Sequence, residues 1–259
     1  SWLGIEFITR MSDSPRTAVI TGAGSGIGRA VAQEFANNGV RLLLVGRRQA
    51  MLEETLASLE GEQHACAAVD VSDALQIKTA ITDFATTNKG IDCLVANAGI
   101  NPQRAAAIDV DQQAWDDTLR VNLTGVHNCC QAVLPHLLKS SAASIVTVGS
   151  IAGLKGMPAR AAYGPTKAAV INYTQTLAAD YSRQGVRANC VCPGFVVTDI
   201  NREWLANLPS AQRESLEQRH LLGLGTPEQV ASVAWFLASP AASWMTGNVI
   251  AVDGGYGCH

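Results

Sequence analysis

TAVITGAGSGIG, residues 17–28, is a short apolar run that leads directly into a glycine-rich turn. The apolar and β-branched residues predict a buried strand, and a helical pattern over residues 26–38 follows. Gly22, Gly26 and Gly28 are spaced G-x-x-x-G-x-G. Such a turn lets backbone N–H groups and the positive end of a helix approach a pyrophosphate. Glycine-rich turns without a nucleotide are about as common, so this motif alone leaves both interpretations open.

Six further apolar runs alternate with helical patterns along the chain. They are RLLLVG (41–46), ACAAVDV (65–71), CLVANAG (93–99), SIVTVGS (144–150), ANCVCPG (188–194) and NVIAVDGG (248–255). The other helical patterns cover residues 49–59, 74–87, 112–139, 159–185 and 227–237. This order indicates βαβ units, and continuous apolar strands are typical of a parallel sheet covered on both faces. We expect an α/β fold: a Rossmann-type doubly wound parallel sheet of about seven strands in a single domain, with the site at the carboxyl ends of the strands.

The composition favours a small-molecule substrate over a macromolecular partner. The 259 residues carry a formal net charge of -3, with Lys and Arg scattered, so we expect no nucleic-acid and no membrane partner. No apolar run reaches the roughly 18 residues of a membrane span. The seven cysteines lack metal-ligand spacing. We therefore expect no metal site, and free thiols in a reducing, cytoplasmic compartment.

The domain is expected to occupy residues 15–259, with residues 1–14 as an N-terminal extension. SWLGIEFITR at 1–10 lacks the basic start and the long apolar stretch of a signal peptide. Met11 follows directly and is typical of a natural start. We therefore interpret residues 1–10 as vector-derived.

A serine, a tyrosine and a lysine stand without His, Asp, Glu or Cys in GSIAGLKGMPARAAYGPTKAAV, residues 149–170. Tyr163 and Lys167 are four residues apart and would share one face of a helix. A fixed ammonium beside a phenol stabilises the phenolate, which suits a general acid and base. The hydroxyl of Ser150, at the end of an apolar strand, can donate to a carbonyl oxygen during reduction. Only a hydride is then missing, and a bound nucleotide could supply it.

The end of the second expected strand bears on cofactor choice. Gly46 stands where a carboxylate would bind the ribose 2'-hydroxyl of NAD. Arg47 and Arg48 follow, and an arginine there can pair with the 2'-phosphate of NADP. The position after this strand favours that interpretation over solvated arginines at a helix start. We expect NADP(H) to be favoured, with NAD(H) also accepted, and the prediction rests on Arg47.

Six motifs in this order and spacing resemble those of the short-chain dehydrogenase/reductase family. They are TGAGSGIG (21–28), NAG (97–99), VNLTG (121–125), Ser150, YGPTK (163–167) and PGFVVT (193–198), and the resemblance spans essentially residues 15–256. It implies hydride transfer between a nicotinamide cofactor and a ketone or secondary alcohol. Tyr163 would be the general acid and base, and Ser150 would hold and polarise the substrate oxygen. Lys167 would bind the nicotinamide ribose and assist Tyr163, while Asn122 would support a water relay to Lys167 or relieve a distorted helix turn.

The resemblance also implies a set of cofactor-binding residues. They are Thr21, Gly22, Gly24, Ser25, Gly26, Ile27, Gly28, Arg47, Asp70, Val71, Asn97, Ala98, Gly99, Val121, Tyr163, Lys167, Pro193, Gly194, Val196 and Thr198. Asp70 could equally begin a helix. Ser25 stands where many NADP-preferring relatives carry a basic residue, so one usual contact to the 2'-phosphate is missing. Pro165 is compatible with the Tyr163 and Lys167 geometry only if the helix begins nearby.

The substrate is left open by the resemblance, because many chemistries share this fold. Relatives carry a mobile substrate lid where residues 199–222 stand here. Trp204, Leu205 and Leu208 have helical spacing within it, and packing against the domain is favoured over contact with a substrate. The lid arginines Arg202, Arg213 and Arg219 fit a solvated face. The candidates for the substrate pocket are Lys155, Met157, Phe195 and Trp204.

Alternative functions remain beside a general ketone or alcohol oxidoreductase. The 3-oxoacyl-acyl-carrier-protein reductases are similar overall, yet Asn128 and Ala179 stand where these enzymes carry basic docking residues. A non-catalytic nucleotide-binding sensor would be favoured by a broken catalytic set, and all four residues are present. The larger epimerases and dehydratases need a C-terminal substrate domain, for which we expect no room in this chain. The resemblance further implies a homotetramer, built through two long helices and the closing strand.

Overall fold

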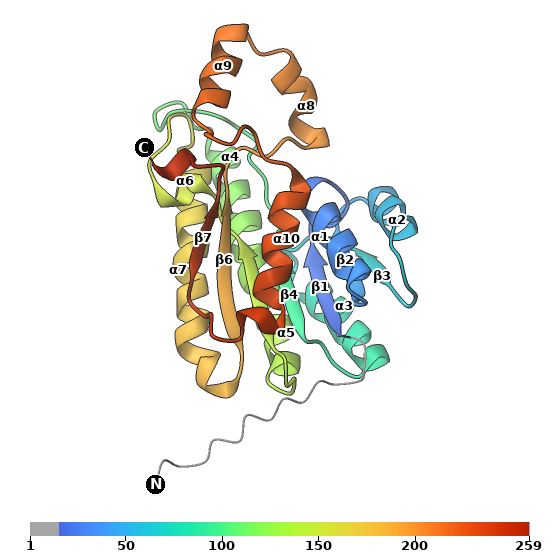
Figure 1. Cartoon of the computed structure of the whole chain (residues 1–259). Coiled ribbons are helices and arrows are strands. Elements are labelled where there is room, and N and C mark those ends of the chain that lie inside the picture. The colour runs from blue at the N-terminus through green and yellow to red at the C-terminus, as the bar shows by residue number, and fades with distance from the viewer. Residues whose placement is uncertain (1–15, 259) are drawn as a thin grey trace.

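A seven-stranded sheet lies between two layers of helices in the computed structural model, which describes residues 16–258 (Figure 1). The strands are β1 (Thr17–Thr21), β2 (Arg41–Gly46), β3 (Ala65–Ala68), β4 (Cys93–Ala96), β5 (Ser144–Val148), β6 (Arg187–Pro193) and β7 (Val249–Val252). All neighbouring strands pair in parallel, in the order β3-β2-β1-β4-β5-β6-β7. The expected doubly wound parallel sheet is therefore confirmed.

Helices form in each stretch where the sequence predicted one, with an interruption in 112–139 and a later start in 159–185, and three further α-helices form outside these stretches in the described residues. The α-helices are α1 (Gly26–Asn37), α2 (Gln49–Ala57), α3 (Ala74–Asn88), α4 (Gln112–Leu119), α5 (Gly125–Leu137), α6 (Ile151–Leu154), α7 (Tyr163–Tyr181), α8 (Asp199–Ala206), α9 (Ser210–Gln218) and α10 (Pro227–Ala238). The pattern over 112–139 predicted one helix, whereas a π-helical turn, Arg120–Thr124, separates α4 from α5. Such a turn widens the helix by one residue, and turns of this kind often mark functional sites.

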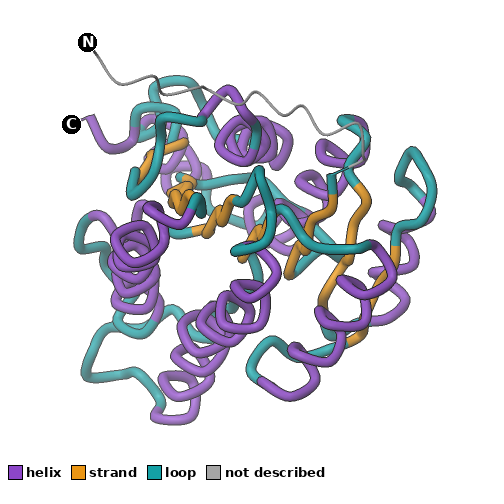
Figure 2. Tube along the Cα trace, turned by 90° about the horizontal axis from the view of Figure 1, so that it is seen from below, coloured by secondary structure: helices purple, strands orange, loops and turns teal. Residues whose placement is uncertain are grey.

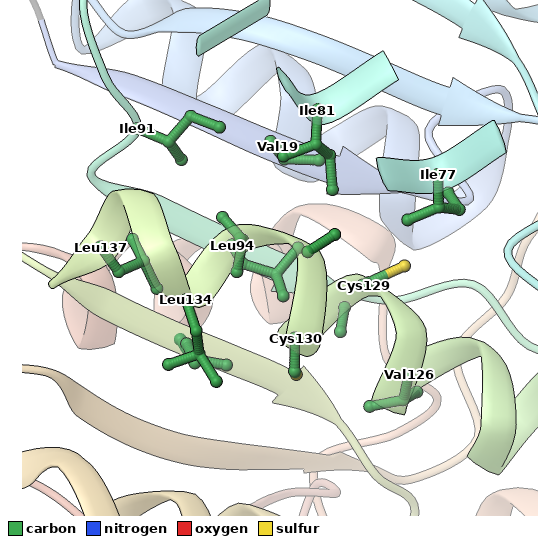
Figure 3. Packing of buried hydrophobic residues seen from close by; sticks show 14 of the residues in the cluster. Val19, Ile77, Ile81, Ile91, Leu94, Val126, Cys129, Cys130, Leu134 and Leu137 are labelled. Carbon is green, nitrogen blue, oxygen red and sulfur yellow. The ribbon is translucent and has the colours of Figure 1, made fainter. Parts of the chain in front are cut away.

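Helices lie on both faces of the sheet (Figure 2), and a hydrophobic core lies between each helix layer and the sheet. Val19 of β1 belongs to the core under α3, α5 and α7, while its neighbours Ala18 and Ile20 belong to the core under α1 and α10. Figure 3 shows Ile77 and Ile81 of α3 packed with Val19 and with side chains of α5. Since successive strand residues point to opposite faces, burial of both faces requires a continuous apolar run. This is the physical reason for sequences such as TAVIT.

The chain reverses its direction across the sheet between β1 and β4. From β1 it proceeds to β2 and β3 on one side, and from β4 to β5, β6 and β7 on the other. The loops after β1 and β4 therefore diverge and leave a crevice at the carboxyl ends of these neighbouring strands, where doubly wound folds bind ligands.

Helix α7 begins at Tyr163, later than the pattern over 159–185 predicted. Ala159 has a φ of 55°, in the left-handed region, so it cannot continue a right-handed helix. Pro165 is the third residue of α7, in the first turn, where backbone N–H groups have no intrahelical acceptor. The helix therefore begins near enough for proline to be tolerated, as the sequence analysis required.

The segment expected to form a lid, residues 199–222, contains α8 and α9 and lies beyond the carboxyl ends of the strands (Figure 1). Among the described residues, no helix is both long and apolar enough to cross a membrane. The expected N-terminal extension, residues 1–14, lies outside the described residues.

Candidate active site

A cleft of about 740 Å³ opens at the carboxyl ends of the strands. Its walls come from the turns after β1 to β6, from the beginning of α7 and from the segment that holds α8 and α9. Of the residues expected to bind the cofactor, all except Thr21 line this cleft. Ser150, Tyr163 and Lys167 line it too, and Asn122 is fully buried outside its wall. The structure thus brings the sequence-predicted site together.

The glycine turn leaves backbone amides open at one end of the cleft. Gly22 has a φ of 67°, which favours glycine. A Cβ on Gly28 would overlap the carbonyl oxygen of Gly22, so the turn can be this tight only without a side chain there. Ser25 precedes α1 and its side chain makes no capping hydrogen bond. The first N–H groups of α1 are therefore available to an anionic ligand, which fits the pyrophosphate of a dinucleotide.

Thr21 acts from behind the cleft by joining the ends of β1 and β4. Its Oγ1 accepts hydrogen bonds from the backbone N–H groups of Asn97 and Ala98, both at 3.0 Å. The Asn97 amide in turn donates to the carbonyl of Thr21 at 2.9 Å. These bonds hold the NAG segment beside the glycine turn, so Thr21 positions residues that line the cleft without lining it itself.

Lys167 is held rigidly at the centre of the cleft. Its side chain is only 3% exposed, and Nζ donates a 2.7 Å hydrogen bond to the carbonyl of Val148, the last residue of β5. The same ammonium lies 5.7 Å from the centre of the Tyr163 ring. Because Tyr163 and Lys167 are i and i+4 on α7, the helix and the end of the sheet together fix their separation.

Asn122 sits in the π-helical turn and locks the segment that follows the NAG motif. Its Oδ1 accepts from the N–H of Ile100 at 2.7 Å, and its Nδ2 donates to the carbonyl of Ile100 at 2.9 Å. Nδ2 also lies 3.2 Å from Oγ1 of Thr166 on α7. A Cβ on Gly99 would lie 3.3 Å from Asn122 Oδ1 and 3.4 Å from Lys167 Nζ. Gly99 therefore leaves the space between these two polar groups free of side chain.

Ser150 caps the short helix α6 after β5. Its Oγ accepts a 3.1 Å hydrogen bond from the N–H of Ala152. One of the two acceptor sites of the hydroxyl is thus engaged by the backbone, while its own proton remains available to a ligand oxygen in the cleft.

Asp70 follows β3 on the nucleotide side of the cleft. Its Oδ1 accepts from the backbone N–H and the hydroxyl of Ser72 at 2.9 and 2.7 Å. Arg120 lies 3.5 Å from its other oxygen. Burial raises the pKa of the Asp70 carboxyl, but the Ser72 bonds and the Arg120 and Arg47 charges outweigh burial and hold it below its usual value. The N-cap of α3 is Asp73, so Asp70 is free of the helix-start role considered above.

The arginines after β2 lie at the same end. Arg47 and Arg48 both line the cleft, and Nη2 of Arg48 lies 3.4 Å from the hydroxyl of Ser25 in the glycine turn. Two cationic side chains and one hydroxyl therefore surround the place where the second strand ends, next to the glycine turn.

The opposite end of the cleft has an apolar wall. Met157, Phe195 and Trp204 line it, with the rings of Phe195 and Trp204 5.7 Å apart. Leu205 is buried against the domain, as expected for the lid helix. Trp204, in contrast, is 39% exposed and faces the cleft, so the favoured packing interpretation does not hold for it.

Lys155, expected in the pocket wall, lies outside the cleft lining. Its Nζ donates to the carbonyl of Tyr256 at 3.1 Å and lies 4.4 Å above the Tyr256 ring. A hydrogen bond and a cation–π contact thus hold the ammonium against the C-terminal segment.

The residues of the cleft wall that the sequence did not mark include Arg104, Arg160, His220 and Tyr256. Arg160 stands three residues before Tyr163, and this spacing was the available signal. His220 Nε2 accepts from the N–H of Phe195 at 3.0 Å, and its ring lies 4.9 Å from that of Tyr256. No local sequence pattern marks His220 and Tyr256, because only the folded chain brings them next to the end of β6.

The lid arginines behave as expected for a solvated face. Arg202 pairs with Asp199, and Arg213 pairs with Glu217, all on the surface of α8 and α9. No group of three or more His, Cys, Asp or Glu in residues 16–258 could hold a metal ion.

A family model described as enoyl-(acyl carrier protein) reductase matches residues 22–257. A solved oxidoreductase of the short-chain dehydrogenase/reductase family from Burkholderia thailandensis superposes with a TM-score of 0.86 and 35% identity, covering 95% of this chain and 94% of that one. The chain belongs to the short-chain dehydrogenase/reductase family. As a short-chain dehydrogenase/reductase, it is an NAD(P)-dependent oxidoreductase that acts on CH–OH groups and the corresponding ketones.

Other members of the short-chain dehydrogenase/reductase family are similar over nearly the whole chain. The 2-(S)-hydroxypropyl-CoM dehydrogenase 3 of Xanthobacter autotrophicus is 39% identical, covering 91% of this chain and 94% of that protein. The 3-oxoacyl-acyl-carrier-protein reductase FabG of Thermotoga maritima is 37% identical, with coverages of 93% and 97%. A structure titled ElxO with NADP bound has a TM-score of 0.88 at 30% identity, covering 95% of this chain and all of that one.

Proposed function

We propose that Tyr163 transfers the proton in a reversible ketone–secondary alcohol conversion at this cleft. In reduction its hydroxyl gives a proton to the substrate oxygen, and in oxidation the phenolate takes the proton back. Ser150 donates a hydrogen bond to the same oxygen and stabilises the negative charge that develops on it. A nicotinamide cofactor, when bound, supplies or accepts the hydride. The meeting of Ser150, Tyr163 and Lys167 at one end of a dinucleotide-sized cleft carries this proposal.

Lys167 acts on Tyr163 and on the cofactor ribose. Its fixed ammonium, 5.7 Å from the centre of the Tyr163 ring, places a positive charge beside the phenol that exchanges the proton. Since Nζ uses one donor on Val148, two remain for the hydroxyls of a ribose or for water. Asn122 forms two hydrogen bonds with Ile100. Because Gly99 has no side chain, the space beside Lys167 Nζ is free, and this arrangement supports a water relay that ends at Lys167.

The residues at the nucleotide end fit a nicotinamide dinucleotide that carries a 2'-phosphate. The glycine turn offers open amides to the pyrophosphate, and Asp70 and Val71 line the adenine side. Asn97 to Gly99 and Val121 would contact the ribose region, and Pro193, Gly194, Val196 and Thr198 the nicotinamide amide. Gly46 brings no carboxylate, while Arg47 and Arg48 supply positive charge. We therefore propose a preference for NADP(H), with NAD(H) accepted.

A 3-oxoacyl-acyl-carrier-protein reductase is the second candidate, and the FabG relatives favour it. The structure weighs against it at one position expected to dock the carrier protein. Asn128 is buried, and its Nδ2 donates to the carbonyl of Val71 at 3.0 Å. Position 128 therefore offers no surface charge, and Ala179, although exposed, offers none either. We keep the general oxidoreductase first, acting on a sugar, polyol, steroid or small keto compound.

A non-catalytic sensor would bind the nucleotide without turnover. The preserved set of Asn122, Ser150, Tyr163 and Lys167, three of which line one cleft, supports catalysis instead. A panel of ketones and alcohols, assayed at 340 nm with NADPH, NADH and their oxidised forms, tests the proposal. We expect turnover of at least one ketone–alcohol pair. Cofactor binding without turnover of any member would favour the sensor.

We also propose that the protein is a cytoplasmic homotetramer. The seven cysteines are free thiols, which suits a reducing compartment. Strand β7 forms an edge of the sheet with partly exposed apolar residues, and Trp244 and Phe236 nearby are 99% and 40% exposed. An uncovered apolar edge of this kind favours association with a second copy.

A further inference from the structure

Two arginines that the proposed chemistry does not use lie at the substrate end of the cleft. Arg104 follows the NAG segment and Arg160 precedes Tyr163 by three residues, and both line the cleft. The N–H of Ala161 lies 3.4 Å from the carbonyl of Ala105, so the loops that carry the two arginines are joined next to them. The two arginines therefore lie on neighbouring loops that both line the cleft.

Neither guanidinium has an acidic partner in the described part of the chain. No Asp or Glu oxygen there lies within 4.0 Å of either guanidinium. Arg160 gives one hydrogen bond, from Nη1 to the carbonyl of Ala159 at 3.0 Å. Arg104 lies 4.1 Å above the ring of Trp204. Since a guanidinium has five N–H donors, most of these donors remain open to a ligand.

The two cations are placed at an energetic cost that an anion would relieve. Burial lowers the pKa of Arg104, and the nearby charge of Arg160 lowers it further. Burial likewise lowers the pKa of Arg160. Like charges brought together in a partly buried site repel each other and lose hydration. A carboxylate or another oxyanion placed between them would receive charge-assisted, bidentate hydrogen bonds.

We propose that Arg104 and Arg160 form an anion subsite, so that the substrate is a ketone or secondary alcohol bearing a carboxylate, sulfonate or phosphate group. This inference rests on the proposed function, because the Tyr163 hydroxyl marks where the reacting oxygen lies. The carbon skeleton between the two groups would contact Met157 and Phe195. Trp204 supports the subsite by holding the Arg104 guanidinium against its ring.

Matched pairs of substrates test the subsite through turnover. Each pair consists of an oxo acid and its neutral methyl ester, with 2-oxo, 3-oxo and 4-oxo acids and a cyclic oxo acid included. Sulfonate and phosphate analogues of the best skeleton distinguish the kinds of anion. We expect the wild type to favour the anion over its ester by about ten- to a hundred-fold in kcat/KM. Equal or better turnover of the esters would overturn the proposal.

Variants that remove one positive charge show which residues cause the preference for the oxo acid over its ester. Arg104→Gln and Arg160→Gln should each reduce kcat/KM for the oxo acid by about tenfold or more and leave that for the ester nearly unchanged. Arg213→Gln, which removes an equally positive lid residue paired with Glu217, is the matched control and should change neither. Loss of activity on acid and ester alike in both cleft variants would assign these arginines a structural role and contradict the subsite.

Binding of unreactive ligands separates the subsite from catalysis. Titration calorimetry in the presence of NADP+ compares saturated carboxylic acids, which have no carbonyl to reduce, with their methyl esters. We expect the acids to bind more tightly than the esters and to lose that advantage in Arg104→Gln and Arg160→Gln. Such a result without turnover of any ketone would leave the subsite standing and contradict the oxidoreductase proposal. Equal binding of acid and ester by the wild type would exclude the subsite itself.

Discussion

The ammonium of Lys167 lies 5.7 Å from the centre of the Tyr163 ring, and a 2.7 Å hydrogen bond to the carbonyl of Val148 keeps it there. The positive charge beside the phenol is therefore built into the packing of α7 against the end of β5.

Replacing Tyr163 by Phe should abolish turnover, because no other titratable group in residues 149–170 is expected to exchange the substrate proton. Cofactor binding, followed by fluorescence titration, should persist because the glycine turn is untouched. Steady-state kinetics on the best substrate gives the test. Retention of more than about a tenth of the wild-type kcat, a barrier change of only about 1.4 kcal/mol, would contradict the role of Tyr163.

Gly28→Ala should disrupt the nucleotide end of the cleft. The new Cβ would overlap the Gly22 carbonyl oxygen, so the turn must open. We expect a loss of cofactor affinity and destabilisation by more than about 2 kcal/mol, measured by titration and by denaturant unfolding. Gly156→Ala is the control, since nothing lies within 4 Å of its Cβ position. A Gly28→Ala protein as stable as this control would contradict the packing described for the turn.

The double variant Gly46→Asp, Arg47→Ala should reverse the cofactor preference. An acid at position 46 would repel the 2'-phosphate and accept from a 2'-hydroxyl. Its Cβ would lie 3.3 Å from a methyl group of the Leu52 side chain, which can move slightly. The arginine–phosphate contact is worth about 1 to 3 kcal/mol, or about five-fold to a hundred-fold in kcat/KM. Arg183→Ala, at an exposed turn after α7, serves as the control. A wild type that favours NADH over NADPH would refute the assignment to Arg47.

Light scattering at micromolar concentration should give a mass about four times the 27.2 kDa of one chain. We expect Trp244→Ser to weaken the association, because Trp244 is almost fully exposed in the isolated chain beside the β7 edge. A mass of one chain for the wild type would show that the exposed edge is not covered by a second copy.

The rate of alkylation should be much lower for the buried cysteines than for the exposed one. Burial raises the pKa of Cys129 to about 12, and it also raises the pKa of Cys93 and Cys130. Near pH 8 these thiols stay protonated and unreactive, and only at much higher pH would the thiolate form. Iodoacetamide followed by peptide mass spectrometry should therefore modify exposed Cys258 first and partly buried Cys66 more slowly. Rapid modification of Cys129 in the folded protein would contradict its burial.

The nucleotide half of the site could be predicted from sequence because its signals are local. Gly22 and Gly28 mark a turn by their own lack of side chains, and each strand is a continuous apolar run. The substrate half could not be predicted in the same way. Arg104 and Arg160 are far apart in the chain and meet only because the loops after β4 and β5 touch near Ala105 and Ala161.

Two other differences have equally physical causes. Lys155 is adjacent to the site in sequence, but the Tyr256 carbonyl and ring attract its ammonium to the C-terminal segment. The helical pattern of 112–139 predicted one unbroken helix; only the polar Asn122 pointed to a distorted turn, and a π-helical turn lies there. It exists because the Asn122 side chain bonds to Ile100 across the cleft wall, which is a tertiary contact.

Tyr256 is buried, lines the cleft and touches both Lys155 and His220. Chain added beyond Cys258 would leave the domain near the cleft, because Tyr256, two residues earlier, lines it. An affinity tag or reporter fused at the C-terminus is therefore badly placed for enzymology. It would crowd the cleft, and the raised KM that results would be mistaken for weak substrate binding. A tag placed before residue 16 would start from the opposite end of the sheet, beside the first residue of β1.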